Sequence, residues 1–185
     1  MATQADLVLS NLGFKAYMYD YADIKSLIEQ ADTDNTKTIT MTLDESKRLY
    51  GVTNVGGFGV TTNTVDGTEL DGDGWTRFVA TNKQANPLTM SFFVRDKNTY
   101  NRLYAQAYDK ETSSEDYYAA FILRYPKKSG TEQLDKNFSK YRDKLVIGCV
   151  TEFTPSEADV STLQSFSITI NSQGRPYDFV EQAAG

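Results

Sequence analysis

The acidic side chains are the first candidates for chemistry in this sequence, and one run of them has the spacing of a calcium loop. In residues 32–36, Asp-Thr-Asp-Asn-Thr, the oxygen-bearing side chains follow the order found early in an EF-hand loop. That loop also needs glycine at its sixth position and glutamate at its twelfth, where this chain has Lys37 and Leu43. We therefore interpret the run as a loop between a helix and a strand, and we predict no metal site there.

A second acidic run, at residues 66–74, alternates carboxylates with glycines. Asp-Gly pairs favour tight turns, so this run is predicted to form the tip of a projecting hairpin that spans residues 58–81. Its acids are interpreted as solvated tip residues rather than as cation ligands. Two carboxylates can also hydrolyse a glycosidic bond, but the scattered acids of this chain single out no such pair.

The residue types that catalysis and metal binding use most are nearly absent. The chain has no histidine and one cysteine, which removes Ser-His-Asp and Cys-His catalysis, imidazole ligands and multi-cysteine zinc sites. Cys149 lies within a predicted strand and is interpreted as a small buried hydrophobic residue. Residues 56–59 lack the lysine and the helix of a phosphate-binding loop. The sequence therefore predicts no cofactor and no enzymatic activity.

Length and charge restrict the classes of partner. The 185 residues are most simply one domain, residues 1–185. The formal net charge of −6 argues against binding to nucleic-acid phosphates or to an anionic membrane. The first residues lack the pattern of a signal peptide, and no apolar run approaches the ~20 residues of a membrane helix. We expect no membrane partner, and a protein kept in a cytoplasm or built into something assembled there.

The sequence predicts mainly β-strands, and it does so most clearly over residues 144–176. Phe166, Ile168 and Ile170 alternate with serine, threonine and asparagine, which is typical of a half-buried strand. Residues 145–153 are apolar at both odd and even positions, which indicates a strand covered on both faces. A polar turn after Pro155 joins the two strands, and the unit ends at residues 174–176, Gly-Arg-Pro.

The rest of the chain supplies further strands and two helices. Strands are predicted at residues 14–21, 36–43, 58–65, 75–81, 88–94 and 117–125, and helices at residues 22–31 and 97–108. Residues 44–50 are expected to form one helical turn, residues 127–142 a polar excursion or loose helix, and residues 177–185 a short tail. The tyrosine stripe Tyr100, Tyr104 and Tyr108 is interpreted as helix-to-sheet packing. Without regular βαβ alternation, the predicted fold class is mainly β (α+β), an antiparallel β-sandwich or barrel with a flanking α-helix.

Part of this pattern resembles the major tail tube proteins of long-tailed bacteriophages. The helix at residues 97–108 directly follows the strand at 88–94. It looks like that family's sheet-flanking helix. The resemblance is strongest over residues 88–176 and weaker before them, and it implies a small β-sandwich that forms hexameric rings stacked into the tail tube. The other matching positions are Gly148, Val150, Phe153, residues 156–159, Leu163, Phe166, Ile168, Thr169 and residues 174–176.

The resemblance also implies partners and a location. The chain would bind copies of itself, with a tape measure protein and tail terminator or distal tail proteins as further partners. Genomic DNA would pass through an acidic lumen without specific binding, because like charges repel. The protein would belong to the virion tail and assemble in the host cytoplasm. Tube proteins of contractile injection systems share this fold, so such a tube is the nearest alternative.

Three structural hypotheses follow from the resemblance. The hairpin tip would contact the next ring, one of two polar strand faces would line the lumen or the ring interface, and free strand edges would pair with neighbouring copies. The tip residues are Asp66, Gly67, Glu69, Asp71 and Asp73. The two polar faces are Thr38, Thr40 and Thr42 on one strand and Ser165, Ser167 and Thr169 on another.

Two other classes stay open at the level of the sequence. An aromatic-rich β-sandwich can hold a carbohydrate or a protein ligand in a groove lined by Tyr or Trp. An enzyme that uses two carboxylates is the third class. Rings and tubes in electron micrographs would favour the tube protein, and a hit in a glycan screen would favour the binding module.

Overall fold

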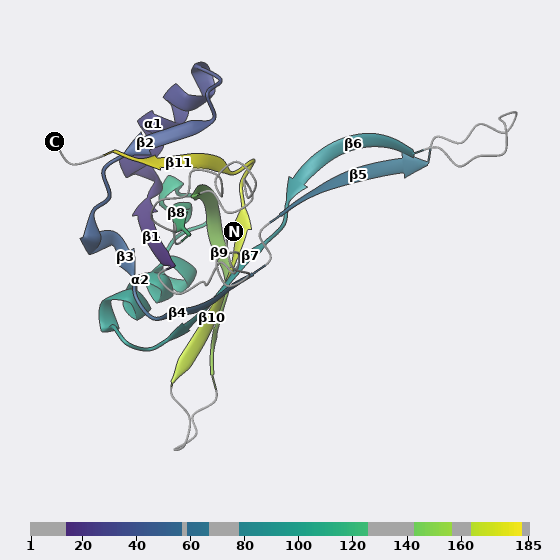
Figure 1. The fold of residues 1–185 in the computed structure, drawn as a ribbon. Helices are drawn as coiled ribbons and strands as arrows, with labels where there is room; N and C mark the ends of the chain where they lie inside the picture. Colours follow the sequence, from purple (N-terminus) through teal and green to yellow (C-terminus); the bar gives the residue numbers. More distant parts are fainter. Residues whose placement is uncertain (1–13, 57–58, 67–77, 126–142, 157–163, 183–185) are drawn as a thin grey trace, which may run out of the picture.

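The structure, a computed structural model, describes residues 14–56, 59–66, 78–125, 143–156 and 164–182 (Figure 1). None of the helices in these ranges is long and apolar enough to cross a membrane. The elements in chain order are β1 (Lys15–Asp20), α1 (Tyr21–Thr33), β2 (Thr38–Met41), the 3-10 turn η2 (Glu45–Lys47), β3 (Arg48–Leu49), β4 (Val52–Gly56), β5 (Val60–Asp66), β6 (Phe78–Ala85), β7 (Leu88–Phe93), α2 (Lys97–Tyr108), the 3-10 turn η3 (Glu115–Tyr117), β8 (Ala119–Arg124), β9 (Lys144–Pro155), β10 (Ser165–Ser172) and β11 (Tyr177–Glu181).

One large sheet organises the body of the molecule. Its strand order is β3-β1-β8-β9-β10-β7-β4, and β11 joins one end of β9 to β2. All the described pairs are antiparallel except β11 with β2. The remaining two strands, β5 and β6, form a separate hairpin. The predicted fold class, antiparallel β-sheet with flanking helix, is therefore confirmed.

Two hydrophobic cores lie on opposite faces of the central strands β1, β8 and β9. Side chains alternate between the two faces of a strand, so Phe121 of β8 faces one core while Ile122 faces the other. The inner core consists of Ala16, Met18, Leu49, Leu88, Met90, Phe92, Leu103, Ala119, Phe121, Leu123, Val146, Val150, Phe153, Phe166, Ile168 and Ile170. The outer core consists of Tyr17, Tyr19, Ile24, Ile28, Ala31, Ile39, Ala120, Ile122, Leu145, Ile147, Tyr177 and Phe179. Because β3 and β7, from opposite parts of the strand order, both contribute to the inner core, the sheet curls around it.

Strand β9 serves both cores because a β-bulge changes its alternation. The register with β10 pairs Val150 with Ile170 and then Glu152 with Thr169, so Thr151 is an extra residue. An extra residue of this kind shifts every later side chain to the other face. Val150 and Phe153, three residues apart, therefore both enter the inner core. The prediction of a strand covered on both faces is confirmed for the first half of β9.

Each helix is attached to the sheet in a different way. The α1 residues Ile24 and Ile28 enter the outer core, whereas α2 inserts Leu103 into the inner core. Arg102 of α2 donates to the Met18 carbonyl oxygen at 2.6 Å. Asp96 caps α2 by accepting from the Thr99 backbone N–H at 2.9 Å, as its position before the helix predicts.

Several predicted elements agree with the structure, two predictions are wrong, and one strand was missed. Strand β7 and helix α2 lie where they were expected, and β5 and β6 form the expected hairpin, which runs on to Ala85. The tail prediction at residues 177–185 is wrong, because Tyr177–Glu181 is β11 and pairs with β2. Strand β4 was not predicted. Cys149 is half-buried rather than buried, and its thiol lies 3.9 Å from the Asn171 carbonyl oxygen. The excursion expected at residues 127–142 lies outside the described residues.

Candidate assembly surfaces

A polar face of the large sheet lies opposite the inner core. The β10 residues Ser165, Ser167 and Thr169 are half-buried and alternate with the fully buried Phe166, Ile168 and Ile170. Residues directly opposite on paired strands share a face, and the registers bring more hydroxyl groups to this one. We call it the hydroxyl face, and it consists of Ser165, Ser167 and Thr169 on β10, Thr89 and Ser91 on β7, and Glu152 and Thr154 on β9.

The hydroxyl face carries one negative charge and no positive charge. The Glu152 carboxylate accepts from the hydroxyl groups of Thr169 at 3.1 Å and Thr154 at 3.3 Å. Strands β4, β7 and β10 and the adjoining part of β9, from Gly148 to Pro155, contain no lysine or arginine. A surface of this kind offers a phosphate backbone no cation to bind.

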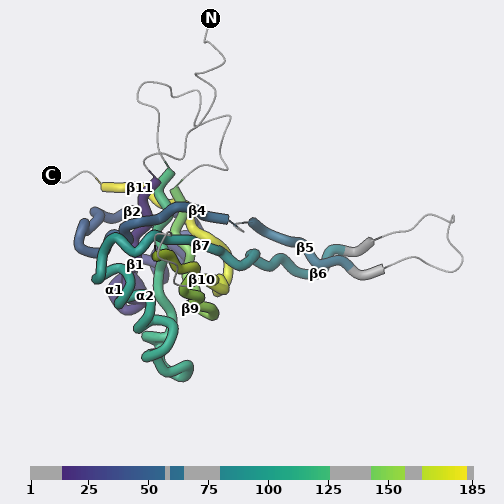
Figure 2. Tube along the Cα trace, turned by 90° about the horizontal axis from the view of Figure 1, so that it is seen from below, coloured from purple at the N-terminus to yellow at the C-terminus, as the bar shows by residue number. Residues whose placement is uncertain are grey.

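The hairpin β5–β6 forms an arm that projects from the body (Figures 1 and 2). No described side chain of the arm belongs to either hydrophobic core. Polar side chains meet across the two strands in the part of the arm whose side chains the structure describes, as where the Asn63 side-chain amide donates to Asn82 Oδ1 at 2.9 Å. The Asn86 backbone N–H donates to the Gly59 carbonyl oxygen at 2.8 Å and closes the base of the arm. A lone two-stranded hairpin is marginally stable in water, so the arm needs a surface that its own subunit does not supply.

Only one of the predicted tip residues lies within the described chain. Asp66 ends β5, where its backbone pairs with Phe78 of β6. The other four, Gly67, Glu69, Asp71 and Asp73, lie outside the described residues. The ring-to-ring contact assigned to this tip is therefore a proposal.

The second predicted polar face lies elsewhere on the molecule. Thr38 and Thr40 belong to β2, which pairs with β11 alone and leaves its other edge free. Thr38 is half-buried, and Thr40 and Thr42 are exposed, whereas Ile39 between them is buried in the outer core. Thr38 and Thr40 line a groove of about 390 Å³ together with Leu27 and Gln30 of α1 and with Asp34, which follows that helix. The structure does not bring these threonines to the hydroxyl face.

The acidic candidates from the sequence have structural partners. Asp32 lies in the last turn of α1, and its carboxylate accepts from the Tyr177 hydroxyl at 2.8 Å and from Lys37 Nζ at 3.2 Å. The Tyr177 hydrogen bond is the main reason why the pKa of Asp32 is lowered. In the parts of the chain that the structure describes, no three acidic or cysteine side chains group as a metal site would require. Residues 34–37 connect α1 to β2, so the predicted loop between a helix and a strand begins two residues later than expected.

The tyrosine stripe on α2 packs against the sheet, and most completely at its first residue. The Tyr100 ring meets Phe153 and Phe166 edge to face at 5.3 and 5.2 Å between ring centroids. Tyr104 and Tyr108 also approach Phe153 but remain 43% and 60% exposed. The packing interpretation is therefore right for Tyr100 and incomplete for the two outer tyrosines.

Charged groups elsewhere hold elements together rather than forming a catalytic pair. The Tyr17 hydroxyl donates to Glu45 Oε1 at 2.8 Å, which ties β1 to η2. Burial, with this hydrogen bond to Glu45, raises the pKa of Tyr17, and the same bond lowers the pKa of Glu45. Asp143 is 3% exposed and accepts from Arg124 Nε at 3.2 Å. The carboxylates of Glu45 and Asp143 are therefore structural, and they pair with Arg48 and Arg124 respectively.

Comparison with known proteins gives matches in structure. No protein-family model and no curated protein matches the chain. A chain from the cryo-EM structure of the anti-feeding prophage baseplate, 6-fold symmetrised, has a TM-score of 0.61 at 8% identity, covering 96% of this chain and 98% of that one. A chain from the sheath-tube complex of PVC, an extracellular contractile injection system, has a TM-score of 0.59 at 12% identity, covering 95% and 97%. A chain from the C6-symmetric tail of an empty gene transfer agent particle has a TM-score of 0.52 at 14% identity, covering 74% and 91%.

The chain has a tail-tube-type fold. At these identities the likeness shows the fold alone. The match to the two injection-system chains nevertheless extends over almost the whole length of all three proteins. The structural match also includes the residues before 88, which precede the range where the sequence resemblance is strongest. The resemblance is thus confirmed for the fold, and the narrower assignment to the major tail protein of a long-tailed phage is a proposal.

Proposed function

We propose that this chain is a structural subunit of a phage tail or a related injection system, and that it assembles into hexameric rings stacked as a tube. The observation that carries the proposal is the β5–β6 arm, which projects from the body of a tail-tube-type fold and whose described side chains belong to neither core. A neighbouring copy supplies the surface that the arm lacks. The sixfold symmetry of the matched baseplate and tail structures supports a ring of six.

Free strand edges support self-association as well. Strand β4 pairs with β7 alone, and β2 pairs with β11 alone. Each leaves a row of backbone N–H and C=O groups without a strand partner in the described chain, and such edges add a strand from another chain. In the ring, these edges are completed by neighbouring copies.

The hydroxyl face is the proposed lumen surface. It is neutral apart from Glu152, and two of its threonine hydroxyls already donate to that carboxylate. DNA therefore finds no cation on it and slides past without specific binding. The β2 threonines, which line a groove beside a free edge, are assigned to the ring interface instead.

Cysteine labelling tests the lumen assignment. In a Cys149→Ala background, Ser167→Cys places a thiol on the hydroxyl face, and Glu29→Cys places one on the exposed side of α1 as the matched control. A maleimide attached to a polymer too large for the lumen is expected to modify both subunits before assembly, but only the α1 cysteine in assembled tubes. Equal labelling of both cysteines in tubes would reject the lumen assignment.

Electron microscopy of the purified protein tests the function itself. Rings and stacked tubes are expected at high concentration, and a protein that stays monomeric there would overturn the proposal. Deleting residues 66–74 removes the predicted ring-to-ring contact and is expected to leave a folded subunit that does not stack. Tubes of normal length from that variant would refute the role of the tip.

The remaining assignments follow from the same proposal. The tube would be part of the virion tail or of an injection system, with a tape measure protein and terminator or distal tail proteins as partners. The structural matches include both a tail and contractile systems, so the proposed role covers both. Such a role requires positioning and self-association, and no catalytic residue.

A further inference from the structure

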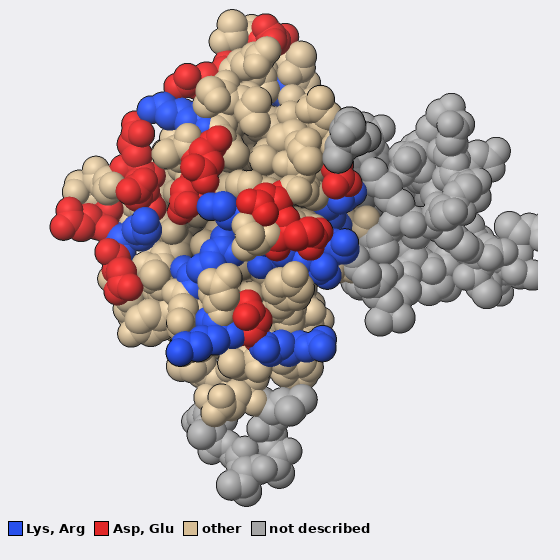
Figure 3. Space-filling view, turned by 90° about the vertical axis from the view of Figure 1, so that its left-hand side faces the viewer, with Lys and Arg blue, Asp and Glu red and all other residues tan. Residues whose placement is uncertain are grey.

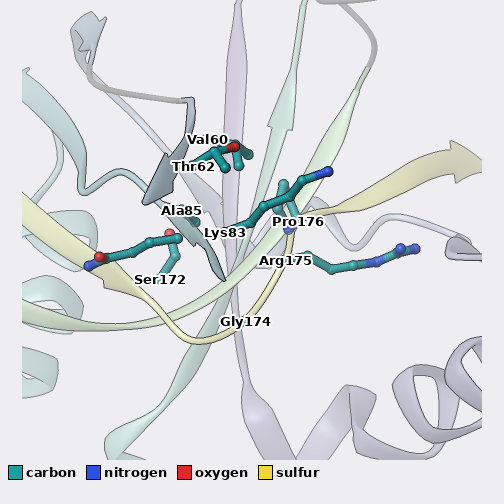
Figure 4. A pocket seen from close by; sticks show the side chains of 9 residues that line it. Val60, Thr62, Lys83, Ala85, Ser172, Gly174, Arg175 and Pro176 are labelled. Atoms are coloured by element: carbon teal, nitrogen blue, oxygen red, sulfur yellow. The ribbon is translucent and has the colours of Figure 1, made fainter. Parts of the chain in front are cut away.

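A groove of about 610 Å³ lies where the arm leaves the body (Figure 4). One wall comes from the arm strands β5 and β6, and the other from the end of β10 and the turn before β11. An occupant of this groove would touch both parts at once. Its lining includes Val60, Thr62 and Lys83 on the arm and Ser172, Gly174 and Arg175 on the body.

The groove carries two cations that form no ion pair with the described residues. Lys83 and Arg175 come from opposite walls, and Figure 4 shows both side chains extending to the same side. Neither forms an ion pair with any described residue, within 4.0 Å. On the side of the molecule opposite the arm, by contrast, lysines and arginines are interspersed with acids (Figure 3), as in the 2.8 Å pair of Lys25 with Glu115.

The body wall of the groove has an unsatisfied polar group and open space. The Ser172 hydroxyl is buried and has no hydrogen-bond partner in the structure. Buried hydroxyl groups normally have a partner, and this one has none among the described residues. Gly174 has a φ of +79°, and a Cβ built on it would meet nothing within 4 Å. The wall is therefore open to an incoming chain.

We propose that this groove receives an acidic segment of a second copy of the chain, with a carboxylate placed between Lys83 and Arg175. The inference rests on the proposed self-assembly and names one contact in it. The charges are complementary, because two unpaired cations lie in a protein whose formal net charge is −6. A ring is closed by heterologous contacts, in which one surface of each copy meets a different surface of the next. The occupant bridges arm and body and so sets the angle of the arm.

Charge reversal tests this contact. The variant Lys83→Glu with Arg175→Glu is expected to keep the wild-type circular dichroism and melting temperature of the monomer, while its critical concentration for assembly rises at least about tenfold. The matched control is Lys97→Glu with Lys110→Glu, which changes the net charge equally at two α2-region lysines without ion pairs in the described chain. The control is expected to assemble within about twofold of the wild type.

The outcomes separate this inference from the proposed function. If the wild type assembles and the groove variant assembles like the control, this inference is wrong and the proposed function stands. If the wild type never assembles, both are overturned. The same measurement at rising salt is expected to weaken assembly of the wild type more than that of Lys83→Gln with Arg175→Gln, because the ion pairs are screened.

Cross-linking identifies the occupant directly. In tubes made from mixed isotope-labelled and unlabelled copies, a carbodiimide is expected to couple Lys83 to a carboxylate of the other copy. Lys83→Arg keeps the charge, and is expected to assemble without forming that cross-link. A Lys83 cross-link found only within one copy would overturn the inference. So would protection of Lys83 from acetylation by double-stranded DNA on the monomer, because the anion would then be a phosphate.

Discussion

Gly148 is the residue at which β9 and β10 approach too closely for a side chain. A Cβ at this position would lie 2.5 Å from the Asn171 carbonyl oxygen and 2.8 Å from Ile170 Cγ2. The backbone oxygen cannot rotate away, so relief requires the two strands to separate. Gly148 lies where the two pairings of β9 overlap, because it is opposite Ala119 of β8 and Ser172 of β10.

Gly148→Ala is therefore expected to lower the free energy of unfolding by about 1–3 kcal/mol, the usual cost of overpacking. The measurement is urea denaturation of the monomer. Gly56→Ala is the control, because its Cβ would meet only the Thr89 hydroxyl, at 3.3 Å, and that side chain can rotate. Its effect is expected to stay within about 1 kcal/mol. Equal effects of the two substitutions would contradict the assigned crowding at Gly148.

The Tyr177–Asp32 hydrogen bond makes part of the stability depend on acid pH. The bond lowers the pKa of the Asp32 carboxyl from its ordinary value of 3.8. Its stabilising effect is thus complete above that value and is lost as the pH falls through the lowered pKa of the folded state. The same hydrogen bond, together with burial, raises the pKa of Tyr177 to about 12, so the hydroxyl keeps its proton across the acid range.

Tyr177→Phe removes the donor and keeps the ring in the outer core. The urea midpoint of this variant is expected to fall less than that of the wild type between about pH 6 and about pH 2.5. Tyr118→Phe serves as the control, because no hydrogen bond of its hydroxyl occurs in the described chain. A variant with the wild-type acid dependence would show that the Asp32 hydrogen bond does not contribute to it.

At the scale of elements, the N-terminal cap of α2 combines sequence-level chemistry with a tertiary role. Asp96 accepts from the backbone N–H groups of Asn98 at 3.2 Å and Thr99 at 2.9 Å and from the Thr99 hydroxyl at 2.9 Å. Thr99 is 1% exposed, and its hydroxyl oxygen in turn accepts from the Tyr50 backbone N–H at 3.0 Å. The cap thus joins α2 to the chain between β3 and β4.

Asp96→Ala is expected to lower the free energy of unfolding by about 1–2 kcal/mol, because the first turn of α2 loses its cap. Asp109→Ala at the other end of α2 is the control. Only the backbone N–H of Asp109 bonds to the helix, at 2.9 Å from the Ala105 carbonyl oxygen, so its effect is expected to be within about 0.5 kcal/mol. Chemical denaturation of both variants measures the difference, and a larger loss for Asp109→Ala would contradict the capping role.

The sequence did not predict β4, whose alternation is interrupted by a bulge, or β11, which is short. In β4, Val52 and Val55 both pack against the inner core although they are three residues apart, because a bulge in the pairing with β7 breaks the alternation. In β11, five residues are too few for a clear period, and the strand exists because it pairs with β2 and β9. The alternation of Phe166, Ile168 and Ile170 in β10 is undisturbed, so that strand was predicted correctly.

At the scale of the whole molecule, the body and the arm have separate sources of stability. The two cores belong to the body, and no described side chain of the arm contributes to either. Gly59 and Asn86 are already joined by a hydrogen bond at the base of the arm, so we expect that the arm can be removed without opening the body. The proposed assembly would stabilise the folded subunit by mass action, and we expect the arm to depend on it most.

The wild-type protein is therefore expected to show a melting temperature that rises with protein concentration, because assembly binds only the folded state. A variant in which a short turn replaces residues 60–85 is expected to melt at one temperature at all concentrations, equal to that of the dilute wild type. Scanning calorimetry over a range of concentrations measures both. A concentration-independent wild type would contradict arm-dependent assembly, and an unfolded variant would contradict the independence of the body.

The sequence by itself determined the classes of local structure and the chemistry that is absent. Alternating side chains, Asp96 before an amphipathic helix, and a chain without histidine can each be recognised in the printed order of residues. The tertiary structure alone decided which polar faces lie together. Ser167 and Thr89 share a face because of the register of β10 with β7, whereas Thr40 lies apart beside α1. It also placed Lys83 and Arg175 in one groove, ninety-two residues apart along the chain. Strand pairing depends on contacts between segments that are distant in the sequence, and the local alternation of residues does not predict those contacts.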